Sequence, residues 1–207
     1  MADRHAHWQN VYATKGETDV SWFQDNPAIS RELIAATGAD REAAIIDIGG
    51  GASRLVDTLL ADGYRAMTVL DLSEAALKTA KDRIGPAANA VTWIAADVTT
   101  WQPVEQYDVW HDRAAFHFLT DPRDRDAYKS RLTKALRTGG QAIIGTFSLQ
   151  GPEKCSGLPV VRYDAPSLGG FLGPAFRLLE TRDHEHRTPW GSSQQFQFSR
   201  FVFGGGA

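Results

Sequence analysis

The sequence has very little cysteine, because Cys155 is the single one among 207 residues. One thiol cannot form an intramolecular disulfide, and it cannot build a zinc site made of several cysteines. No apolar run approaches the ~20 residues that a membrane-spanning helix needs, and residues 1–8 lack the apolar core of a signal peptide. We therefore expect a cytoplasmic protein with no membrane association and no metal site.

A surplus of positive charge is also missing. Lys and Arg number 22, Asp and Glu number 25, and the net charge is −3. Proteins that bind duplex nucleic acid or anionic membranes usually carry a basic stripe, so the charge balance argues against both partners. Hydrophobic residues make up 43% of the chain, which is enough for a core, and the length predicts a single domain.

Patterns typical of helices and strands alternate through most of the chain. Short apolar runs predict five strands, at residues 43–48, 66–70, 91–95, 107–110 and 141–147. Helical patterns predict one helix before the first strand, at residues 27–38, and three between strands, at residues 53–62, 73–84 and 123–137. Asn26 and Ser73 are the predicted caps of the first and third. Strands that are separated by helices pair in parallel, so the sequence predicts a doubly wound α/β sheet.

The single domain is expected over residues 1–203, in parts that differ in composition. They are an aromatic-rich N-terminal arm (residues 1–26), the alternating core (40–150), a loop with two further strands (151–203) and a loose tail (204–207). The two further strands, at residues 176–182 and 195–203, have no helix between them. Consecutive strands of this kind predict an antiparallel hairpin at the edge of the sheet.

A glycine-rich turn follows the first predicted strand. It contains Gly49, Gly50 and Gly51, with Asp47 before it and Ser53 after it. A tight strand-to-helix turn that passes close to a ligand needs glycines, because no side chain then stands in the way. The spacing departs from the dinucleotide pattern G-x-G-x-x-G. Asp47 would repel a pyrophosphate but suits an ammonium group, which argues against the alternative of a nicotinamide-dependent oxidoreductase.

Two further acids stand at the ends of the next two predicted strands. Asp71 follows Gly51 by roughly 20 residues, the distance at which an acid can accept hydrogen bonds from both ribose hydroxyls of a nucleotide. Asp97 could accept from an adenine amino group, while Leu72 and Val98 cover the faces of the ring. A lone strand-end aspartate is commonly a turn or cap residue, but three acids at consecutive strand ends indicate a nucleotide-type site.

The pattern Asp47-x-Gly49-x-Gly51, together with Asp71 and Asp97, resembles the first three motifs of class I S-adenosylmethionine-dependent methyltransferases of the compact single-domain bacterial type. The resemblance implies a seven-stranded Rossmann-like sheet in the order 3-2-1-4-5-7-6, with strand 7 antiparallel and helices on both faces. It also implies S-adenosylmethionine as cofactor and S-adenosylhomocysteine as product. The methionine end would lie at the glycine turn, the ribose at Asp71 and the adenine at Asp97.

The resemblance places the transferring methyl group at the end of the fourth strand, from His111 to His117. Both histidines are candidate bases, because imidazole titrates near neutral pH. Each could instead be a hydrogen-bonded packing residue, and His111 could hold the cofactor. Arg113 is a further catalytic candidate, with an ion pair to Asp112 or Asp108 as the alternative. Ser53 stands where many members of the family have a third glycine.

The segment after the fifth strand is expected on the acceptor side of the pocket. Cys155 in this segment is a catalytic candidate or an inert loop thiol, depending on its pKa. Arg162 and Tyr163, with Phe116 and Trp22, are candidate contacts for the acceptor. The arm that carries Trp22 could close over the site as a lid, or its aromatic residues could only cover the sheet edge.

The acceptor is predicted to be a small molecule, such as a thiol or another soft nucleophile. The fourth strand is not followed by the Asn/Asp-Pro-Pro-Tyr/Phe tetrapeptide that family members acting on planar amides and base amino groups use. Alignment of donor and acceptor supplies much of the rate of methyl transfer, so a general base is not obligatory. Protein-lysine methylation and a non-catalytic partner role remain alternatives, and we expect a monomer or homodimer.

Overall fold

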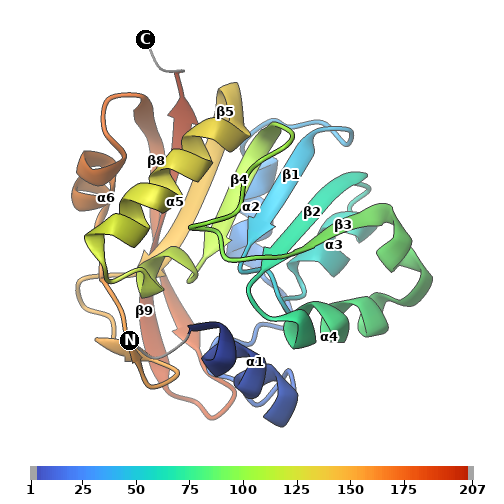
Figure 1. Cartoon of the computed structure of the whole chain (residues 1–207). Helices are drawn as coiled ribbons and strands as arrows, with labels where there is room; N and C mark the ends of the chain where they lie inside the picture. The colour runs from blue at the N-terminus through green and yellow to red at the C-terminus, as the bar shows by residue number, and fades with distance from the viewer. Residues whose placement is uncertain (1–3, 205–207) are drawn as a thin grey trace.

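The computed structural model describes residues 4–204, so residues 1–3 of the predicted arm and 205–207 of the predicted tail lie outside the described residues. Seven strands form one twisted sheet in the order β3-β2-β1-β4-β5-β9-β8 (Figure 1). Their bounds are β1 Ala44–Ile48, β2 Ala66–Asp71, β3 Val91–Ala95, β4 Tyr107–Arg113, β5 Leu136–Phe147, β8 Phe176–Arg187 and β9 Ser193–Phe203. β1 to β5 pair in parallel, and β9 runs antiparallel between β5 and β8. The predicted sheet order, with the last strand antiparallel, is confirmed.

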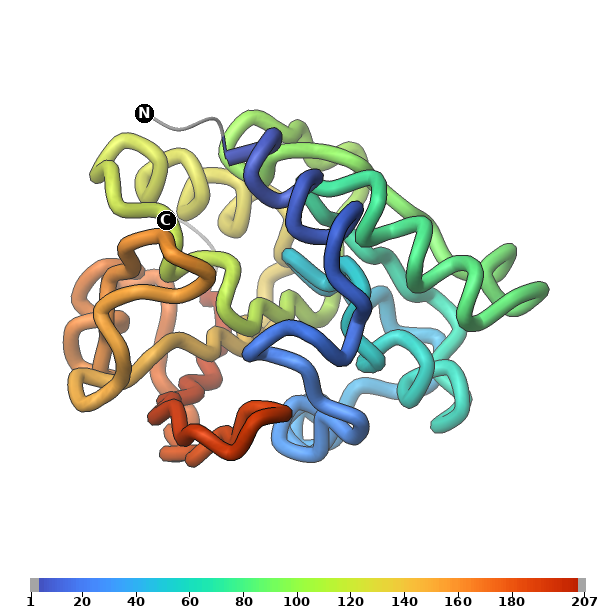
Figure 2. Tube along the Cα trace, turned by 90° about the horizontal axis from the view of Figure 1, so that it is seen from below, coloured from blue at the N-terminus to red at the C-terminus, as the bar shows by residue number. Residues whose placement is uncertain are grey.

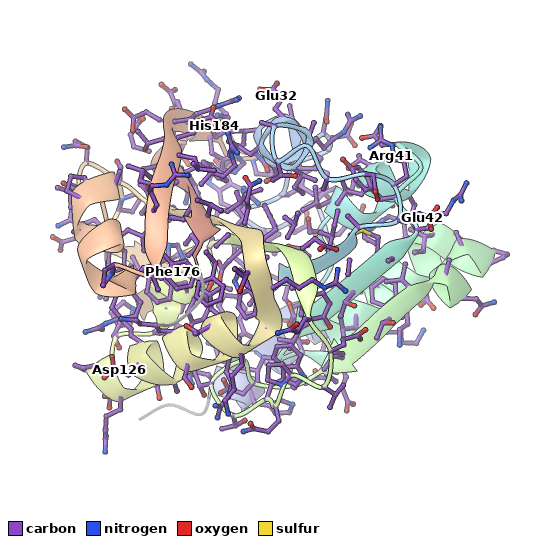
Figure 3. The ribbon with its side chains drawn as sticks, turned by 90° about the horizontal axis from the view of Figure 1, so that it is seen from above. Glu32, Arg41, Glu42, Asp126, Phe176 and His184 are labelled. Carbon is purple, nitrogen blue, oxygen red and sulfur yellow. The ribbon has the colours of Figure 1, made fainter. Side chains whose placement is uncertain are left out.

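Helices cover both faces of the sheet. On one face, α5 (Pro122–Ala135) and α6 (Ala165–Leu172) bury Tyr128, Leu132 and Leu168. The other face is covered by α2 (Ala28–Ala35), α3 (Leu55–Ala61) and α4 (Glu74–Ile84), which form a second apolar cluster. In Figure 3, Glu32 on α2 and Asp126 on α5 point away from the sheet on its opposite sides.

Several predicted element ends are corrected by the structure. Asn26 does not cap α2, because Pro27 is the N-cap residue and no side chain accepts from the first amides. The helix predicted to Arg137 ends at Ala135, and β5 begins directly at Leu136. The cap of α4 is confirmed, since the Ser73 hydroxyl accepts from the amide of Ala76 at 3.2 Å.

Shorter elements complete the chain. They are α1 (Arg4–Thr14), the 3-10 turns η1 (Gly85–Ala90) and η2 (Phe116–Phe118), and the small hairpin of β6 (Lys154–Cys155) and β7 (Leu158–Pro159). Within residues 4–204, no helix is both long and apolar enough to cross a membrane.

The predicted arm contains a helix, α1, that lies near the carboxyl ends of the parallel strands (Figure 1). Seen from below, it runs alongside α4 (Figure 2). Gln9 joins the two helices, because its side-chain oxygen accepts from the hydroxyl of Ser73 at 3.0 Å and from the amide of Ala75 at 3.2 Å. The arm therefore contributes to the N-terminus of α4, where four backbone amides lack partners within the helix.

Candidate active site

A pocket lies at the carboxyl ends of the parallel strands, and we call it the main pocket. β1, β2, β3 and β4 contribute residues at or just after their last positions, and α1 contributes part of another wall. The lining includes most of the residues predicted to hold the cofactor: Asp47, Gly49, Gly50, Ser53, Asp71, Leu72, Asp97, Val98 and His111. Gly51 belongs to the same turn. The structure thus brings the predicted cofactor residues together.

The glycine turn allows two acids to lie against the backbone. Gly49 and Gly51 have positive φ angles of 68° and 32°, a region that favours glycine. A Cβ atom on Gly50 would lie 2.5 Å from Oδ2 of Asp47, and one on Gly51 would lie 2.6 Å from Oδ2 of Asp71. Side chains at these positions would collide with the carboxylates, so glycine is required for both approaches.

Asp47 is held by a buried hydrogen-bond chain. Its Oδ1 lies 2.7 Å from Nδ1 of His111, and Nε2 of the same ring lies 2.9 Å from the hydroxyl of Ser30 on α2. All three side chains are almost completely buried. A carboxylate can only accept, so Nδ1 donates to Asp47, while Nε2 shares its hydrogen bond with the Ser30 hydroxyl. Both ring nitrogens of His111 are therefore engaged.

Asp71 is buried at the end of β2, with 7% of its surface exposed. Its Oδ1 accepts from the amide of Ser73 at 2.7 Å. Burial raises the pKa of this carboxyl to about 7, and the neighbouring charge of Asp47 acts in the same direction, while hydrogen bonds from backbone amides oppose the shift. An acid in this state can gain hydrogen bonds from a ligand that supplies hydroxyl donors.

Asp97 follows β3 and binds the arm. Its Oδ1 accepts from the amide of Thr99 at 2.8 Å and from the Thr99 hydroxyl at 2.7 Å. Its Oδ2 accepts from Nη2 of Arg4 at 3.0 Å, and Nη1 of Arg4 lies 3.0 Å from Asp124 at the start of α5. Arg4 thus fastens α1 to acids of two distant segments, one after β3 and one at the start of α5.

Aromatic side chains of the arm form part of the pocket lining. Trp8 packs edge-on against Trp22 and against Phe118, with ring centroids 5.5 and 4.9 Å apart. Nε1 of Trp22 donates to the hydroxyl of Tyr12 at 3.0 Å. The carbonyl of Trp22 accepts from Nη1 and Nη2 of Arg113, each at 3.0 Å. The arm is therefore bonded to the end of β4 as well as to α4.

The predicted ion pair of Arg113 with Asp112 or Asp108 is wrong. Neighbouring residues of a strand point to opposite faces, so Asp112 lies away from Arg113. Asp112 instead accepts from the hydroxyl of Tyr128 at 2.8 Å, and Asp108 accepts from Arg137 at 2.6 Å. Burial raises the pKa of Asp112 to about 6. Arg113 reaches the pocket without an acidic partner of its own on β4.

Cys155 of β6 lines the main pocket but is a poor nucleophile. Only 5% of its surface is exposed. Burial raises the pKa of the thiol to about 11, although the nearby Arg113 charge and Ser21 act in the opposite direction. The reactive form of cysteine is the thiolate, which is scarce at neutral pH with such a pKa.

Four predicted acceptor-side residues lie outside the lining of the main pocket. His117 is fully buried between the rings of Phe118 and Phe147, and burial lowers its pKa to about 3. The Phe147 amide lies 3.4 Å from its Nδ1. Of the other three, Phe116 and Tyr163 pack in the apolar core, and Arg162 donates to loop carbonyls at 3.1 and 3.2 Å. Trp22 is the predicted acceptor contact that lines the pocket.

Residues that the sequence analysis did not single out complete the pocket. Arg4 and Ser30 make specific hydrogen bonds to predicted site acids or to their partners, and Phe118 supplies an apolar wall. No local motif marks Arg4 or Ser30, since each acts through a contact between distant parts of the chain. Within the described part of the chain, no three His, Cys, Asp or Glu side chains are grouped so that they could hold a metal ion.

Comparison with known proteins agrees with this geometry. Residues 45–140 match a family model described as a methyltransferase domain. The malonyl-[acyl-carrier protein] O-methyltransferase of Anoxybacillus flavithermus is 33% identical over 105 residues, which are 50% of this chain and 38% of that protein. Thiocyanate methyltransferase 1 of Arabidopsis thaliana is 26% identical over 133 residues, 63% of this chain and 57% of that protein. The chain thus spans about two fifths of the length of the first relative and just over half of the length of the second.

A solved structure extends the likeness to nearly the whole fold. The N-methyltransferase NodS of Bradyrhizobium japonicum, in complex with S-adenosylhomocysteine, superposes with a TM-score of 0.73 at 17% identity. The match covers 97% of this chain and 99% of that one. The family model covers the glycine turn, Asp71 and Asp97, and the sheet order is that of the same fold. Residues 45–140 are thus similar to methyltransferase domains, and nearly the whole chain has the fold of this methyltransferase.

Proposed function

We propose that this protein transfers the methyl group of S-adenosylmethionine to a small molecule that carries a soft nucleophile, such as a thiol. The main pocket carries the proposal. Its lining contains three acids at or just after the ends of β1, β2 and β3, together with aromatic residues of the arm. Such an arrangement suits a nucleoside cofactor with a small acceptor beside it.

The residues of the pocket fit this cofactor. Asp71 would accept from the ribose hydroxyls, and its burial without a ligand donor agrees with that role. Asp97 would accept from the adenine amino group, with Leu72 and Val98 against the ring. Asp47, held against the glycine turn by His111, would accept from the ammonium of the methionine end. The bound cofactor supplies a methyl group on a sulfonium, which is already electrophilic.

A soft nucleophile is favoured because none of the predicted catalytic candidates His111, His117 and Cys155 is a ready base. Both nitrogens of His111 are engaged, and His117 lies outside the pocket lining with a pKa of about 3. The Cys155 thiol has a pKa of about 11 and stays protonated at neutral pH. An acceptor that ionises by itself, such as a thiol, needs no proton acceptor from the protein.

The names of the relatives agree with a soft or anionic acceptor. One relative is named for thiocyanate and one for a malonyl group on a carrier protein. Since the chain spans only part of each, they support the reaction class more than the acceptor. A cytoplasmic location and a monomeric or homodimeric state complete the proposal, and cell fractionation and sedimentation measurements test them.

Formation of S-adenosylhomocysteine tests the function directly. The purified protein is incubated with S-adenosylmethionine and a panel of thiols, thiocyanate, amines and carboxylates. We expect turnover with thiols or thiocyanate and little with amines. If no panel compound yields S-adenosylhomocysteine, and labelled methyl groups from the cofactor reach a protein in cell extract, protein-lysine methylation is favoured instead. Tight binding of NAD without binding of S-adenosylhomocysteine would overturn the cofactor assignment.

A further inference from the structure

Among residues 4–204, no carboxylate lies within ion-pair distance of Arg113 at the end of β4. Its two terminal nitrogens donate to one backbone oxygen, the carbonyl of Trp22. The other arginines that line the main pocket or adjoin it, Arg4 and Arg54, each form ion pairs with two acids. Arg113 forms no ion pair within 4.0 Å in the part of the chain that the structure describes.

The hydrogen-bond capacity of Arg113 is only partly used. A guanidinium carries five N–H donors, and two of them go to Trp22. The Nε atom is buried and has no hydrogen-bond partner in the described part of the chain. Burial of the guanidinium lowers its pKa to about 10, while nearby Cys155, Asp47 and Tyr12 act in the opposite direction. A cation enclosed in this way is costly unless an anion or further acceptors compensate for its lost solvation.

A second cavity, which we call the side cavity, lies next to the main pocket. Tyr12, Trp22, Ser53 and Arg113 line both. Gln24 also lines the side cavity, and its buried Oε1 has no hydrogen-bond partner among residues 4–204. Oε1 of Gln24 in the arm and Nε of Arg113 on β4 therefore belong to residues that line the same side cavity. This cavity lies beside the glycine turn, where the methionine end of the cofactor is expected.

We propose that Arg113 binds a negative charge on the acceptor, so that the enzyme selects small anionic acceptors over neutral ones of the same shape. The proposal rests on the proposed function, because it assigns the acceptor class of that pocket. The anion would compensate the guanidinium and take up N–H donors that Trp22 leaves free. Charge-assisted hydrogen bonds of this kind are about twice as strong as neutral ones.

Acceptor selectivity provides the first test. Mercaptoacetate carries a carboxylate beside its thiol, and mercaptoacetamide carries a neutral amide there. The carboxylate raises the pKa of the neighbouring thiol, so kcat/KM is compared per thiolate. We expect wild-type kcat/KM to favour mercaptoacetate by about tenfold to a hundredfold, the range for hydrogen bonds to charged groups. Arg113→Gln should bring the ratio close to one, whereas Arg113→Lys should retain part of the preference. Arg177→Gln, an exposed arginine on β8, is the matched control.

A wild-type ratio near one would overturn the proposal, whatever the variants do. If the enzyme methylates neither thiol, the affinities of mercaptoacetate and mercaptoacetamide for the complex with S-adenosylhomocysteine test the proposal. Tryptophan fluorescence can monitor this binding, because the carbonyl of Trp22 accepts from Arg113. Equal binding of the two would again reject an anion site. Failure to bind S-adenosylhomocysteine, with anion binding retained, would overturn the proposed function and leave the anion site standing.

The competing role for Arg113 is contact with the carboxylate of the cofactor itself. Methylthioadenosine lacks the amino-acid end of the cofactor, so it separates the two roles. We expect Arg113→Gln to change the affinities for S-adenosylhomocysteine and for methylthioadenosine to the same small extent. A loss of about tenfold or more for S-adenosylhomocysteine alone would assign Arg113 to the cofactor and overturn the acceptor role.

Discussion

Nδ1 of His111 lies 2.7 Å from Oδ1 of Asp47, and this contact joins the ends of β1 and β4. The imidazole holds one carboxylate oxygen, while the other lies against the glycine turn beside Gly50. His111 is therefore a positioning residue for Asp47, and its second nitrogen is bonded to Ser30. The orientation of the Asp47 carboxylate is therefore fixed before any ligand binds, and such preorganisation allows a site to bind its ligand in one defined geometry.

Asp47→Asn should weaken S-adenosylhomocysteine more than methylthioadenosine. The substitution removes the negative charge expected to face the ammonium, and only the first ligand has this group. Loss of one charge-assisted hydrogen bond corresponds to about tenfold to a hundredfold in affinity. Isothermal titration calorimetry measures both ligands, with the exposed Asp126→Asn as control. An equal loss for both ligands would contradict this placement of the methionine end.

Cofactor affinity should rise with pH through the pKa of Asp71, about 7. Below this pKa the carboxyl is protonated and accepts ribose hydroxyls less well, whereas above it the carboxylate accepts from both. Between about pH 6 and about pH 8 we expect the dissociation constant of S-adenosylhomocysteine to fall by about tenfold and then level off. Asp71→Asn should bind weakly at every pH, without this change. A wild-type affinity that is flat over the range would contradict the assignment.

Arg4→Ala should speed the release of S-adenosylhomocysteine. The substitution removes the two ion pairs that fasten α1 to Asp97 and Asp124. Partly exposed pairs are worth up to about 1 kcal/mol each, so we expect dissociation to be about two- to tenfold faster in stopped-flow measurements. Arg65→Ala removes an exposed pair with Glu42 and serves as control. An unchanged rate would show that the arm does not retain the ligand.

His117→Gln should lower stability while leaving turnover nearly intact. His117 is buried and uncharged at neutral pH, with its Nδ1 near the amide of Phe147. Glutamine keeps an acceptor but packs less well against the flanking rings, so we expect a loss of about 1–3 kcal/mol in the free energy of unfolding. Chemical denaturation and kcat measure the two effects. A large fall in kcat with unchanged stability would restore His117 as a catalytic candidate.

Much of the fold could be predicted from local sequence. The apolar run before Gly49 and the cap at Ser73 depend on neighbouring residues, and both are found where they were expected. Helix ends were less accurate. Asn26 has a typical capping side chain, but its oxygen faces Arg31 at 3.3 Å instead of the first amides of α2. A side-chain partner from the next turn replaced the local cap.

Site residues at the ends of strands could be predicted from the sequence. Residues whose position depends on packing or on distant contacts could not. Asp47, Asp71 and Asp97 converge because parallel strands end at one edge of the sheet. His117 was placed by its distance from β4, yet the 3-10 turn η2 carries it into the core. Arg4 meets Asp97 across a separation of 93 residues, and no periodicity or motif reports such a contact.

The bond between Gln9 and Ser73 ties the arm to the acid that is expected to hold the ribose. The amide of Ser73 donates to Asp71, while the hydroxyl of the same residue donates to Gln9. If α1 swings outward, Ser73 loses that partner and the first turn of α4 loses an acceptor. A change in the arm would thus free the Ser73 hydroxyl and the Ala75 amide together, in the same turn that supplies an amide to Asp71.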